Sequence, residues 1–315
     1  MTTMKKYFPL IVLGCLAMLP LIGLSDYIMH IIILVLMWSV IGMAWNLLGG
    51  YCGQVSFGHA AFFGVGAYSA GILYYHTGIT AWWGMPIAVG AALLVALGIG
   101  FISLRLRGPY FVLSTLAIGE IFRIFAENLE EYTQGNLGIM IQQRSWVEKA
   151  PYFYIILGIA ALTFVVVKIV AESKWGYYFV AIREDQDAAE SLGINSTLFK
   201  TIALSLSGVF TGIAGAFYMN YMGYIDPGIV FALGEISILT VMVVMVGGVA
   251  TYWGPIVGAV IMVFFSELIR SLPTVGAAHQ TLFGILLIVI IIFLPNGIVG
   301  DFPKLLRLFG IGRKP

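Results

Sequence analysis

Residues 27–48 read YIMHIIILVLMWSVIGMAWNLL, an apolar run that contains no Asp, Glu, Lys or Arg. A helix of about 20 such residues crosses the hydrocarbon core of a bilayer, which is about 30 Å thick. Similar runs recur along almost the whole chain, so this stretch is not one anchor on a soluble domain. The sequence therefore predicts an all-α protein that crosses a membrane many times, with residues 1–315 forming a single membrane-embedded domain.

The composition of the chain points to the same class of protein. Of the 315 residues, 60% are hydrophobic and 10% are charged, whereas soluble domains carry roughly 25% charged residues. A net charge of +1 gives no basis for nucleic-acid binding. Both cysteines, Cys15 and Cys52, lie in or beside apolar runs, which argues against a disulfide framework.

The apolar runs divide into about ten predicted spans when each is required to reach a membrane-crossing length. The third span is rich in glycine and is expected to be either straight, broken or re-entrant. The predicted spans are Phe8–Leu24, Tyr27–Leu48, Tyr51–Tyr75, Trp82–Leu104, Tyr110–Ala126, Tyr152–Val170, Leu198–Tyr221, Leu233–Ala250, Pro255–Arg270 and Thr281–Leu294.

Basic residues predict the orientation, because they accumulate on the cytoplasmic side of membrane proteins. An even number of spans with both termini in the cytoplasm places most of the 16 Lys and Arg residues in cytoplasmic segments or at the adjoining helix ends. The loop 127–150 carries several glutamates and is predicted to be periplasmic. Segment 172–197, between the sixth and seventh spans, is predicted to lie in the cytoplasm and is called the coupling segment, because it is expected to contact a cytosolic partner protein. The basic residues that lie elsewhere are Arg123, Arg144, Lys149 and Arg270.

The centre of this coupling segment predicts a short helix over residues 184–192. Acidic residues at its start suit the positive end of a helix dipole, and a glycine after it suits a left-handed helix end. Its small apolar face fits a groove on a cytosolic partner; the alternative is a solvated helix lying on lipid headgroups. Docking is favoured because helices on the anionic inner leaflet are usually basic. The residues assigned to coupling are Arg183, Glu184, Asp185, Asp187, Ala188, Ala189, Leu192 and Gly193.

Asp187-Ala188-Ala189 followed by Gly193 resembles the Glu-Ala-Ala-x3-Gly signature by which ATP-binding-cassette (ABC) importer permeases contact their ATPases, with Asp replacing Glu. Further stretches resemble the M-type permeases of branched-chain amino-acid importers, a family related to urea and amide importer permeases. One departure is Thr133–Gly138 (TQGNLG), where that family usually has Thr-Gly-Gly-x-x-Gly. The matching stretches are Asn46–Phe62, Leu104–Phe111, Ala181–Asn195, Gly247–Gly248, Trp253–Pro255 and Leu294–Gly297.

This resemblance implies a multi-pass protein of the bacterial inner membrane, without enzymatic activity, that moves Leu, Ile or Val by alternating access. It implies four kinds of neighbour: a second homologous permease, two ABC ATPase subunits, a substrate-binding protein and membrane lipid. The chain has no Gly-x4-Gly-Lys-[Ser/Thr] phosphate loop, so no cofactor is expected in it, and ATP and Mg would bind the ATPases. Urea, amides and other amino acids remain open as substrates.

Ionisable residues inside a span are costly and are therefore candidates for function. Glu120 and Arg123 lie one helical turn apart in the fifth span, and Glu267 and Arg270 repeat that spacing in the ninth. Each pair is interpreted either as a locally neutralised pair near the outer helix end or as part of the mouth of the translocation path.

Three polar residues of the glycine-rich third span, Gln54, Ser56 and His59, are further candidates for the path. The alternative is that they belong to close helix packing through small residues, where a buried polar side chain needs a partner.

An ion-driven secondary transporter is the alternative function. It would need charged residues in the middle of the membrane, whereas the clear charges lie towards the outer helix ends. A membrane-embedded enzyme is disfavoured, because the chain contains neither His-Glu-x-x-His nor Gly-x-Ser-x-Gly.

Overall fold

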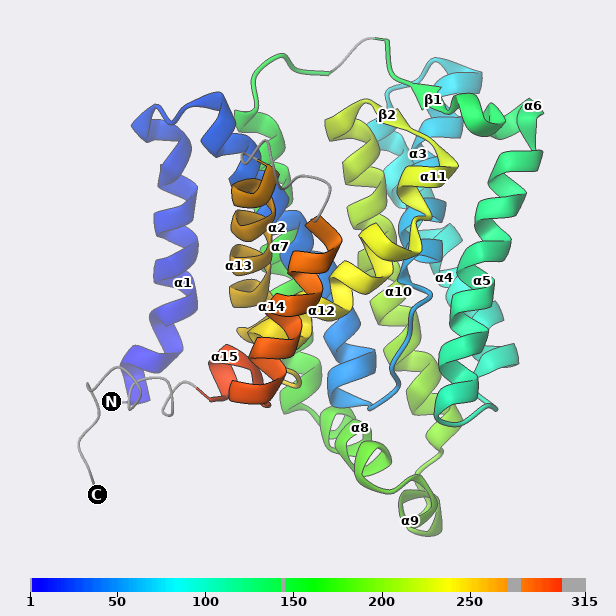
Figure 1. Ribbon diagram of the computed structural model, residues 1–315, viewed down its shortest axis with the longest axis vertical. Coiled ribbons are helices and arrows are strands. Elements are labelled where there is room, and N and C mark those ends of the chain that lie inside the picture. Colours follow the sequence, from blue (N-terminus) through cyan, green and yellow to red (C-terminus); the bar gives the residue numbers. More distant parts are fainter. Residues whose placement is uncertain (1, 143–144, 271–278, 302–315) are drawn as a thin grey trace.

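The computed structural model describes residues 2–142, 145–270 and 279–301 (Figure 1). Within these ranges the regular structure is helical apart from one two-stranded sheet, so the all-α prediction is confirmed. The longer helices are α1 (Thr2–Met18), α2 (Asp26–Asn46), α3 (His59–Thr77), α4 (Gly84–Ser103), α5 (Pro109–Asn128), α7 (Ala150–Glu172), α8 (Lys174–Glu184), α10 (Ser196–Met222), α12 (Leu239–Gly247), α13 (Gly254–Arg270) and α14 (His279–Phe293). The short elements are α6 (Glu130–Thr133), α9 (Gln186–Ser191), α11 (Pro227–Val230), α15 (Gly297–Gly300), β1 (Ile139–Met140) and β2 (Tyr224–Ile225).

Six helical segments of the described chain are long and apolar enough to cross a membrane. They fall on the second, fourth, fifth, sixth, seventh and eighth predicted spans, so the prediction of a multi-pass membrane protein is confirmed. Shorter apolar helices occupy parts of the first, ninth and tenth, and the total of ten stays a prediction. The six segments are Asp26–Tyr51, Ala81–Ser103, Pro109–Asn128, Ala150–Glu172, Ser196–Met222 and Pro227–Gly247.

Helix α2 lies in the interior of the bundle, against α7, α10, α12 and α13. It is apolar on all sides, which is the pattern of a buried helix rather than of a helix with one exposed face. In agreement with this, 89% of the residues in its most apolar 18-residue stretch are buried. The stretch that predicts the membrane fold is thus also the core around which the other helices pack.

Helices α3 and α10 form the most extensive helix pair and approach unusually closely. A Cβ atom on Gly66 would lie 1.9 Å from the carbonyl oxygen of Gly212, and one on Gly215 would lie 1.9 Å from that of Phe63. Helices in a bilayer associate through van der Waals packing, and small residues let their backbones come together. Glycines in both helices therefore set the contact between α3 and α10.

The predicted third span, Tyr51–Tyr75, is wrong as a continuous helix, and the alternative of a broken span is correct. The second helix continues through a π-helical turn, Leu47–Tyr51, and residues 52–58 are not helical before α3 begins at His59. Gly53 has a φ of +70°, a left-handed conformation that glycine adopts without strain. The indole of Trp45 donates a hydrogen bond to the carbonyl oxygen of Ser56, 2.8 Å away, and so ties down the break.

A second break separates α12 from α13, so the predicted span Leu233–Ala250 ends early, at Gly247. Gly248 and Ala250 have φ values of +135° and +56°, which end the helix. The fully buried Asn46 accepts a hydrogen bond from the Ala250 N–H (2.9 Å) and donates one to the carbonyl oxygen of Thr251 (2.8 Å). Asn46 therefore satisfies backbone groups of this break from the end of α2.

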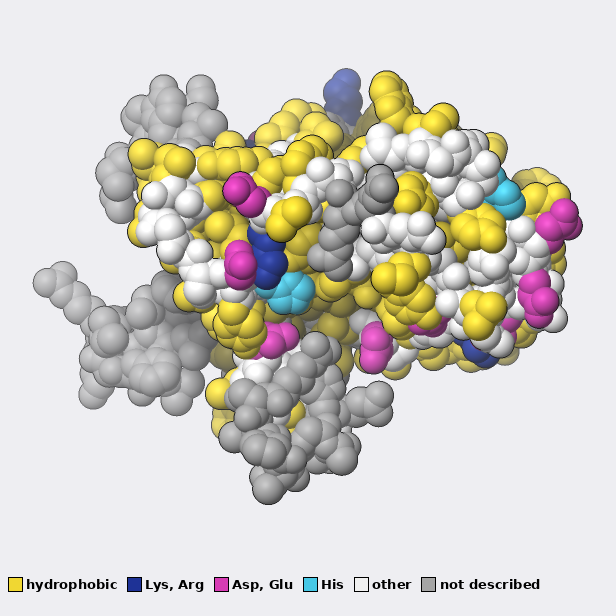
Figure 2. All heavy atoms as spheres, turned by 90° about the horizontal axis from the view of Figure 1, so that it is seen from above, with side chains coloured by type: hydrophobic (Ala, Val, Ile, Leu, Met, Phe, Trp, Pro, Cys, Tyr) yellow, Lys and Arg dark blue, Asp and Glu magenta, His cyan; other side chains and the backbone are white. Residues whose placement is uncertain are grey.

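The two ends of the bundle differ. At one end, β1 pairs antiparallel with β2, which holds the 127–150 loop to the link between α10 and α11. Seen from above, this end shows acidic side chains, with some basic and histidine side chains, scattered among hydrophobic and uncharged ones, and some of the acidic ones lie at the edge where α6 lies (Figure 2). At the opposite end, α8 and α9 project from the bundle (Figure 1).

Candidate functional site

The projecting segment consists of two helices rather than the single helix predicted over residues 184–192. Glu184 is the last residue of α8, so its assignment to the first turn of the coupling helix is wrong. Asp185 has an extended backbone between the two helices, and its carboxylate accepts hydrogen bonds from the N–H groups of Asp187 (2.9 Å) and Ala188 (3.0 Å). Because an N-cap side chain satisfies the free donors of a first turn, Asp185 starts α9 two residues later than predicted.

The end of α9 lies where the sequence places it. Gly193 has a φ of +86° and open space around the position of a Cβ atom, as the left-handed helix end predicts. Ala189 is buried against the bundle, whereas Ala188 and Leu192 point outward, with Leu192 83% exposed. The predicted apolar face is thus divided, and only Ala188 and Leu192 are available to a partner.

Within the projecting segment, helix α8 contacts the first break, which is the non-helical stretch 52–58 and the π-helical turn before it. Phe179 and Ile182 are buried beneath it. The guanidinium of Arg183 donates a hydrogen bond to the carbonyl oxygen of Gly50 (3.2 Å) and pairs with Glu184 (2.6 Å). A Cβ atom on Gly53 would lie 2.6 Å from the Arg183 side chain, so α8 rests directly on the broken region.

Helix α9 is connected to α10 by a network of four side chains. Lys200 Nζ donates to Gln186 Oε1 (2.6 Å), and Gln186 Nε2 donates to Glu190 Oε1 (2.8 Å) and to Ser196 Oγ (3.1 Å). Ser196 also donates to Glu190. Hydrogen bonds from Ser196 and Gln186 hold the pKa of Glu190 below its ordinary value. Outside this network, Asp187 pairs with Arg107 at 2.9 Å on the surface.

The three path candidates of the third span lie around the first break. Gln54 is half-buried, whereas Ser56 and His59 are 1% and 0% exposed. Ser56 Oγ accepts a hydrogen bond from the Gly58 N–H (3.1 Å), and His59 Nε2 lies 2.6 Å from Ser207 Oγ on α10. Ser56 and His59 therefore have partners within the bundle, which is the geometry of the packing interpretation.

On α5 the structure brings the predicted pair together and adds a third member. Arg123 Nε donates to Glu120 Oε1 and Oε2 (3.1 and 3.0 Å), and its guanidinium also pairs with Glu127. Only 22% of the residues in the most apolar 18-residue stretch of α5 are buried, and the side chain of Glu120 is 46% exposed. An ion group thus lies on the outward side of a helix that is apolar enough to span a membrane.

The second predicted pair is described only in part. The side chain of Arg270 lies outside the described residues. Glu267 accepts a hydrogen bond of 3.2 Å from the hydroxyl of Tyr27, at the start of α2. This contact places Glu267 beside the end of the bundle opposite to α8 and α9 (Figure 1).

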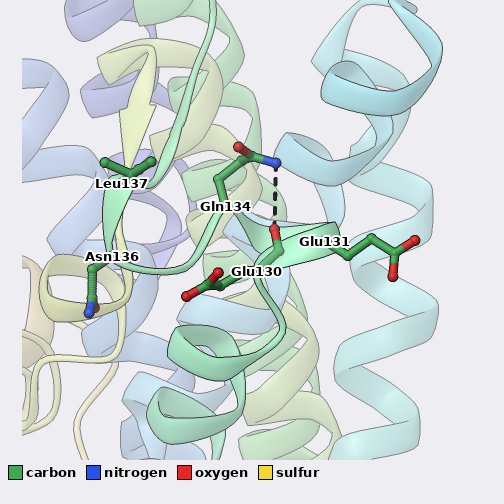
Figure 3. A pocket seen from close by; sticks show the side chains of 5 residues that line it. All are labelled: Glu130, Glu131, Gln134, Asn136 and Leu137. Atoms are coloured by element: carbon green, nitrogen blue, oxygen red, sulfur yellow. Dashed lines mark hydrogen bonds between the residues drawn. The ribbon is translucent and has the colours of Figure 1, made fainter.

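Three residues of segment Thr133–Gly138, which departs from the family pattern, line a hollow of about 420 Å³ at the loop end: Gln134, Asn136 and Leu137 (Figure 3). Gln134 has a φ of +61°, so it adopts the left-handed conformation that glycine favours, at the position where the resembling family usually has glycine. Glu130 and Glu131 of α6 border the same hollow, with their carboxylates directed away from each other (Figure 3).

Sequence reasoning missed Asn46, Gln186 and Lys200 as parts of the site. The signal for Asn46 is an amide side chain at the end of an otherwise apolar run. The signal for Gln186 and Lys200 is weaker, because a glutamine and a lysine in or beside a segment that is predicted to be cytoplasmic are expected to be ordinary surface residues. In the described parts of the chain, no group of three or more His, Cys, Asp or Glu side chains could hold a metal ion.

Comparison with known proteins gives one matching family, described as the permease component of branched-chain amino acid transport systems, which matches residues 27–293. The high-affinity branched-chain amino acid transport system permease protein LivM of Escherichia coli (strain K12) is 27% identical, over 95% of this chain and 76% of that protein. LivM of Salmonella typhimurium is 27% identical, over 84% of this chain and 68% of that protein.

A more distant relative is the permease protein LivH of Escherichia coli (strain K12), which is 21% identical over 84% of this chain and 91% of that protein. No solved structure matches the chain significantly. The family match covers most of the sequence and includes both breaks, the helix pair α8–α9 and the α5 ion group. The chain therefore belongs to the family of permease components of branched-chain amino acid transport systems, which is a transport family and not an enzyme class.

Proposed function

We propose that this chain is the M-type permease subunit of an ABC importer that carries Leu, Ile and Val across the bacterial inner membrane. The family match and the names of the relatives support both the transport role and the substrate class. The complete importer would contain a second homologous permease, two ATPase subunits that bind ATP and Mg, and a substrate-binding protein.

We assign the α8–α9 end to the cytoplasm, with ten spans and both termini on that side. The distribution of charge supports this assignment, because cytoplasmic segments are rich in Lys and Arg. Lys174 and Arg183 belong to α8, and Arg105 and Arg107 lie in the link between α4 and α5, where Arg107 pairs with Asp187 of α9. The loop 127–150, at the opposite end, is the periplasmic loop in this arrangement and contains four glutamates.

The observation that carries the proposal is the outward face of α9. Ala188 and Leu192 are exposed on a helix that projects from the bundle, while Ala189 of the same helix is buried against the bundle and holds the helix in place. A small apolar face held in a fixed position suits a groove on another protein. In the proposed mechanism, ATPase closure displaces α9 and re-orients the spans between an outward-open and an inward-open arrangement.

The α5 ion group is assigned to the wall of the translocation path. Charged groups that face lipid are costly, and in membrane proteins they usually face protein or water. A second permease packed near α5 would complete an aqueous path along Glu120 and Arg123. Glu267 is placed at the outer mouth, whereas Ser56 and His59 support the break beside the path.

The experiment compares Ala188→Trp with Leu94→Trp in membranes that contain the complete importer. Leu94 lies on the outward side of α4 and is 72% exposed, so it controls for added bulk away from α9. Ala188→Trp is expected to abolish ATPase retention on the purified permease and substrate uptake, while the permease still inserts in the membrane. Normal ATPase retention and uptake in Ala188→Trp would refute the docking role.

A further inference from the structure

Lys200 is a buried lysine at the beginning of a membrane-spanning helix. It lies in the second turn of α10, at the end of the bundle from which α8 and α9 project, and is 1% exposed. A lysine at such a position could extend to water, as long basic side chains usually do at helix ends. Its ammonium instead lies beneath α9 and donates to the amide oxygen of Gln186 at 2.6 Å. Burying a charge in this way requires compensating hydrogen bonds.

The Gln186 amide links this buried cation to a carboxylate. Its oxygen accepts from Lys200, and its nitrogen donates to Glu190 (2.8 Å) and to Ser196 (3.1 Å). These contacts determine the orientation of the amide, because its acceptor faces an ammonium and its donor faces a carboxylate. Gln186 is the first residue of α9 and Glu190 is its fifth, so both ends of the helix are bonded to side chains of α10.

A second polar contact joins α9 to the bundle at the surface. The ion pair between Arg107 and Asp187 joins side chains that are 57% and 74% exposed. Exposed pairs of this kind contribute little, because solvent screens them and both side chains lose conformational freedom. Two members of the Lys200 network, Lys200 and Ser196, are buried, whereas Glu190 lies at the surface. This network is therefore the better shielded of the two polar connections between α9 and the bundle.

We propose that Lys200 is a positioning residue that locks α9 onto α10, so that a displacement of α9 becomes a displacement of α10. The proposal rests on the proposed coupling role of α9 and names the residue that transmits its motion. Beyond Lys200, the glycine contacts between α10 and α3 would carry the motion to the break before α3. The partner that moves α9 is the ATPase, and Lys200 itself contacts no substrate.

A cysteine already present in the chain can report on the contact between α9 and α10. Cys52 is fully buried at the first break, in one apolar cluster with Ala189 of α9 and Leu204 of α10. Cys15, the other cysteine, is exposed and would be replaced by serine in all variants. Separation of α9 from α10 would open the region around Lys200, and Cys52 would then react faster with a maleimide.

The test compares Lys200→Met with Lys174→Met in the complete importer reconstituted in lipid vesicles. Methionine has a similar length and leaves no large cavity. It also leaves no charge buried, because Gln186 is neutral and Glu190 is exposed, so the fold is retained. Lys174, at the start of α8, is exposed and controls for the loss of a lysine at this end. The measurements are ATPase retention, ATP hydrolysis, uptake per ATP hydrolysed, and the rate of Cys52 labelling.

Lys200→Met is expected to retain the ATPases and to hydrolyse ATP, while uptake per ATP falls about tenfold and Cys52 labelling rises about tenfold. Loss of a hydrogen bond from a charged donor accounts for a change of this size. The double exchange Gln186→Lys with Lys200→Gln keeps an ammonium beside Glu190 and a hydrogen bond between the two helices. It is expected to restore most of the coupling.

Unchanged uptake per ATP and unchanged Cys52 labelling in Lys200→Met would overturn the lock. Loss of ATPase retention in both Lys200→Met and the double exchange would also overturn it, because the network would then serve docking alone. The Ala188→Trp variant separates these results from the proposed function. If Ala188→Trp abolishes ATPase retention and Lys200→Met is silent, α9 docks the ATPase but Lys200 does not transmit its motion.

Discussion

Replacing Gly215 by alanine is expected to destabilise the bundle, because the new Cβ atom would meet the backbone of α3. It would lie 1.9 Å from the carbonyl oxygen of Phe63, and Cβ contacts shorter than 3.0 Å essentially do not occur. The two helices would therefore have to separate by about 1 Å. Overpacking typically costs 1–3 kcal/mol, and a gap of this size weakens the remaining contacts, so we expect a loss of about 2–4 kcal/mol.

The matched control is Gly98→Ala on α4. Gly98 is exposed within its helix and has no atom within 4 Å of the Cβ position, so alanine fits there. Because alanine has a higher helix propensity than glycine, Gly98→Ala should leave the stability of the protein unchanged or raise it by up to about 1 kcal/mol.

The assay is thermal unfolding of the purified permease in lipid nanodiscs, followed by the reaction of buried Cys52 with a fluorogenic maleimide in a Cys15→Ser background. At roughly 2–4 °C per kcal/mol, the midpoint of Gly215→Ala should fall by at least about 4 °C, and that of Gly98→Ala should not fall. Equal midpoints for the two variants would refute the close crossing of α3 and α10.

Three further changes test other parts of the structure. Asn46→Leu should lower stability by about 2–4 kcal/mol in the same unfolding assay, because two backbone groups of the second break lose their partners; no change would refute that role. Arg123→Gln should reduce uptake at least about fivefold while leaving the unfolding midpoint nearly unchanged, since partly exposed ion pairs contribute only about 0–1 kcal/mol. Full uptake in this variant would instead assign Glu120 and Arg123 to the helix end. Asp185→Ala should weaken ATPase binding about fivefold through loss of a helix cap of about 1 kcal/mol, measured by titration of the ATPase; Asp185→Asn, which can still cap, should bind normally.

Hydropathy alone predicts most of the membrane-spanning architecture, because the bilayer imposes one length on every apolar helix. The break before α3 is one of the alternatives that the glycines of residues 51–75 predict. Gly193 likewise ends α9 as expected, since its left-handed conformation is a local property of the chain. These features depend on residues that are neighbours along the chain and on the length that a bilayer requires of an apolar helix, so they can be inferred from a sequence.

Contacts between distant helices could not be predicted in the same way. Lys200 counts as a cytoplasmic basic residue in the sequence, yet the packing of α9 over α10 buries it. Asn46 is another example, because its partners lie more than 200 positions away along the chain. The sequence misplaces the start of α9 because Glu184 and Asp185 both suit a first turn, and only the extended backbone at Asp185 shows that α8 ends before it.

The most direct test of the coupling account is disulfide or bifunctional cross-linking from Ala188→Cys to the ATPase in intact inner membranes, with Cys15 replaced by serine. The account predicts one cross-linked product between permease and ATPase, and labelling of Ala188→Cys only by reagents that reach the cytoplasmic side. Labelling from the periplasmic side, or failure to cross-link in an importer that is actively transporting, would contradict it.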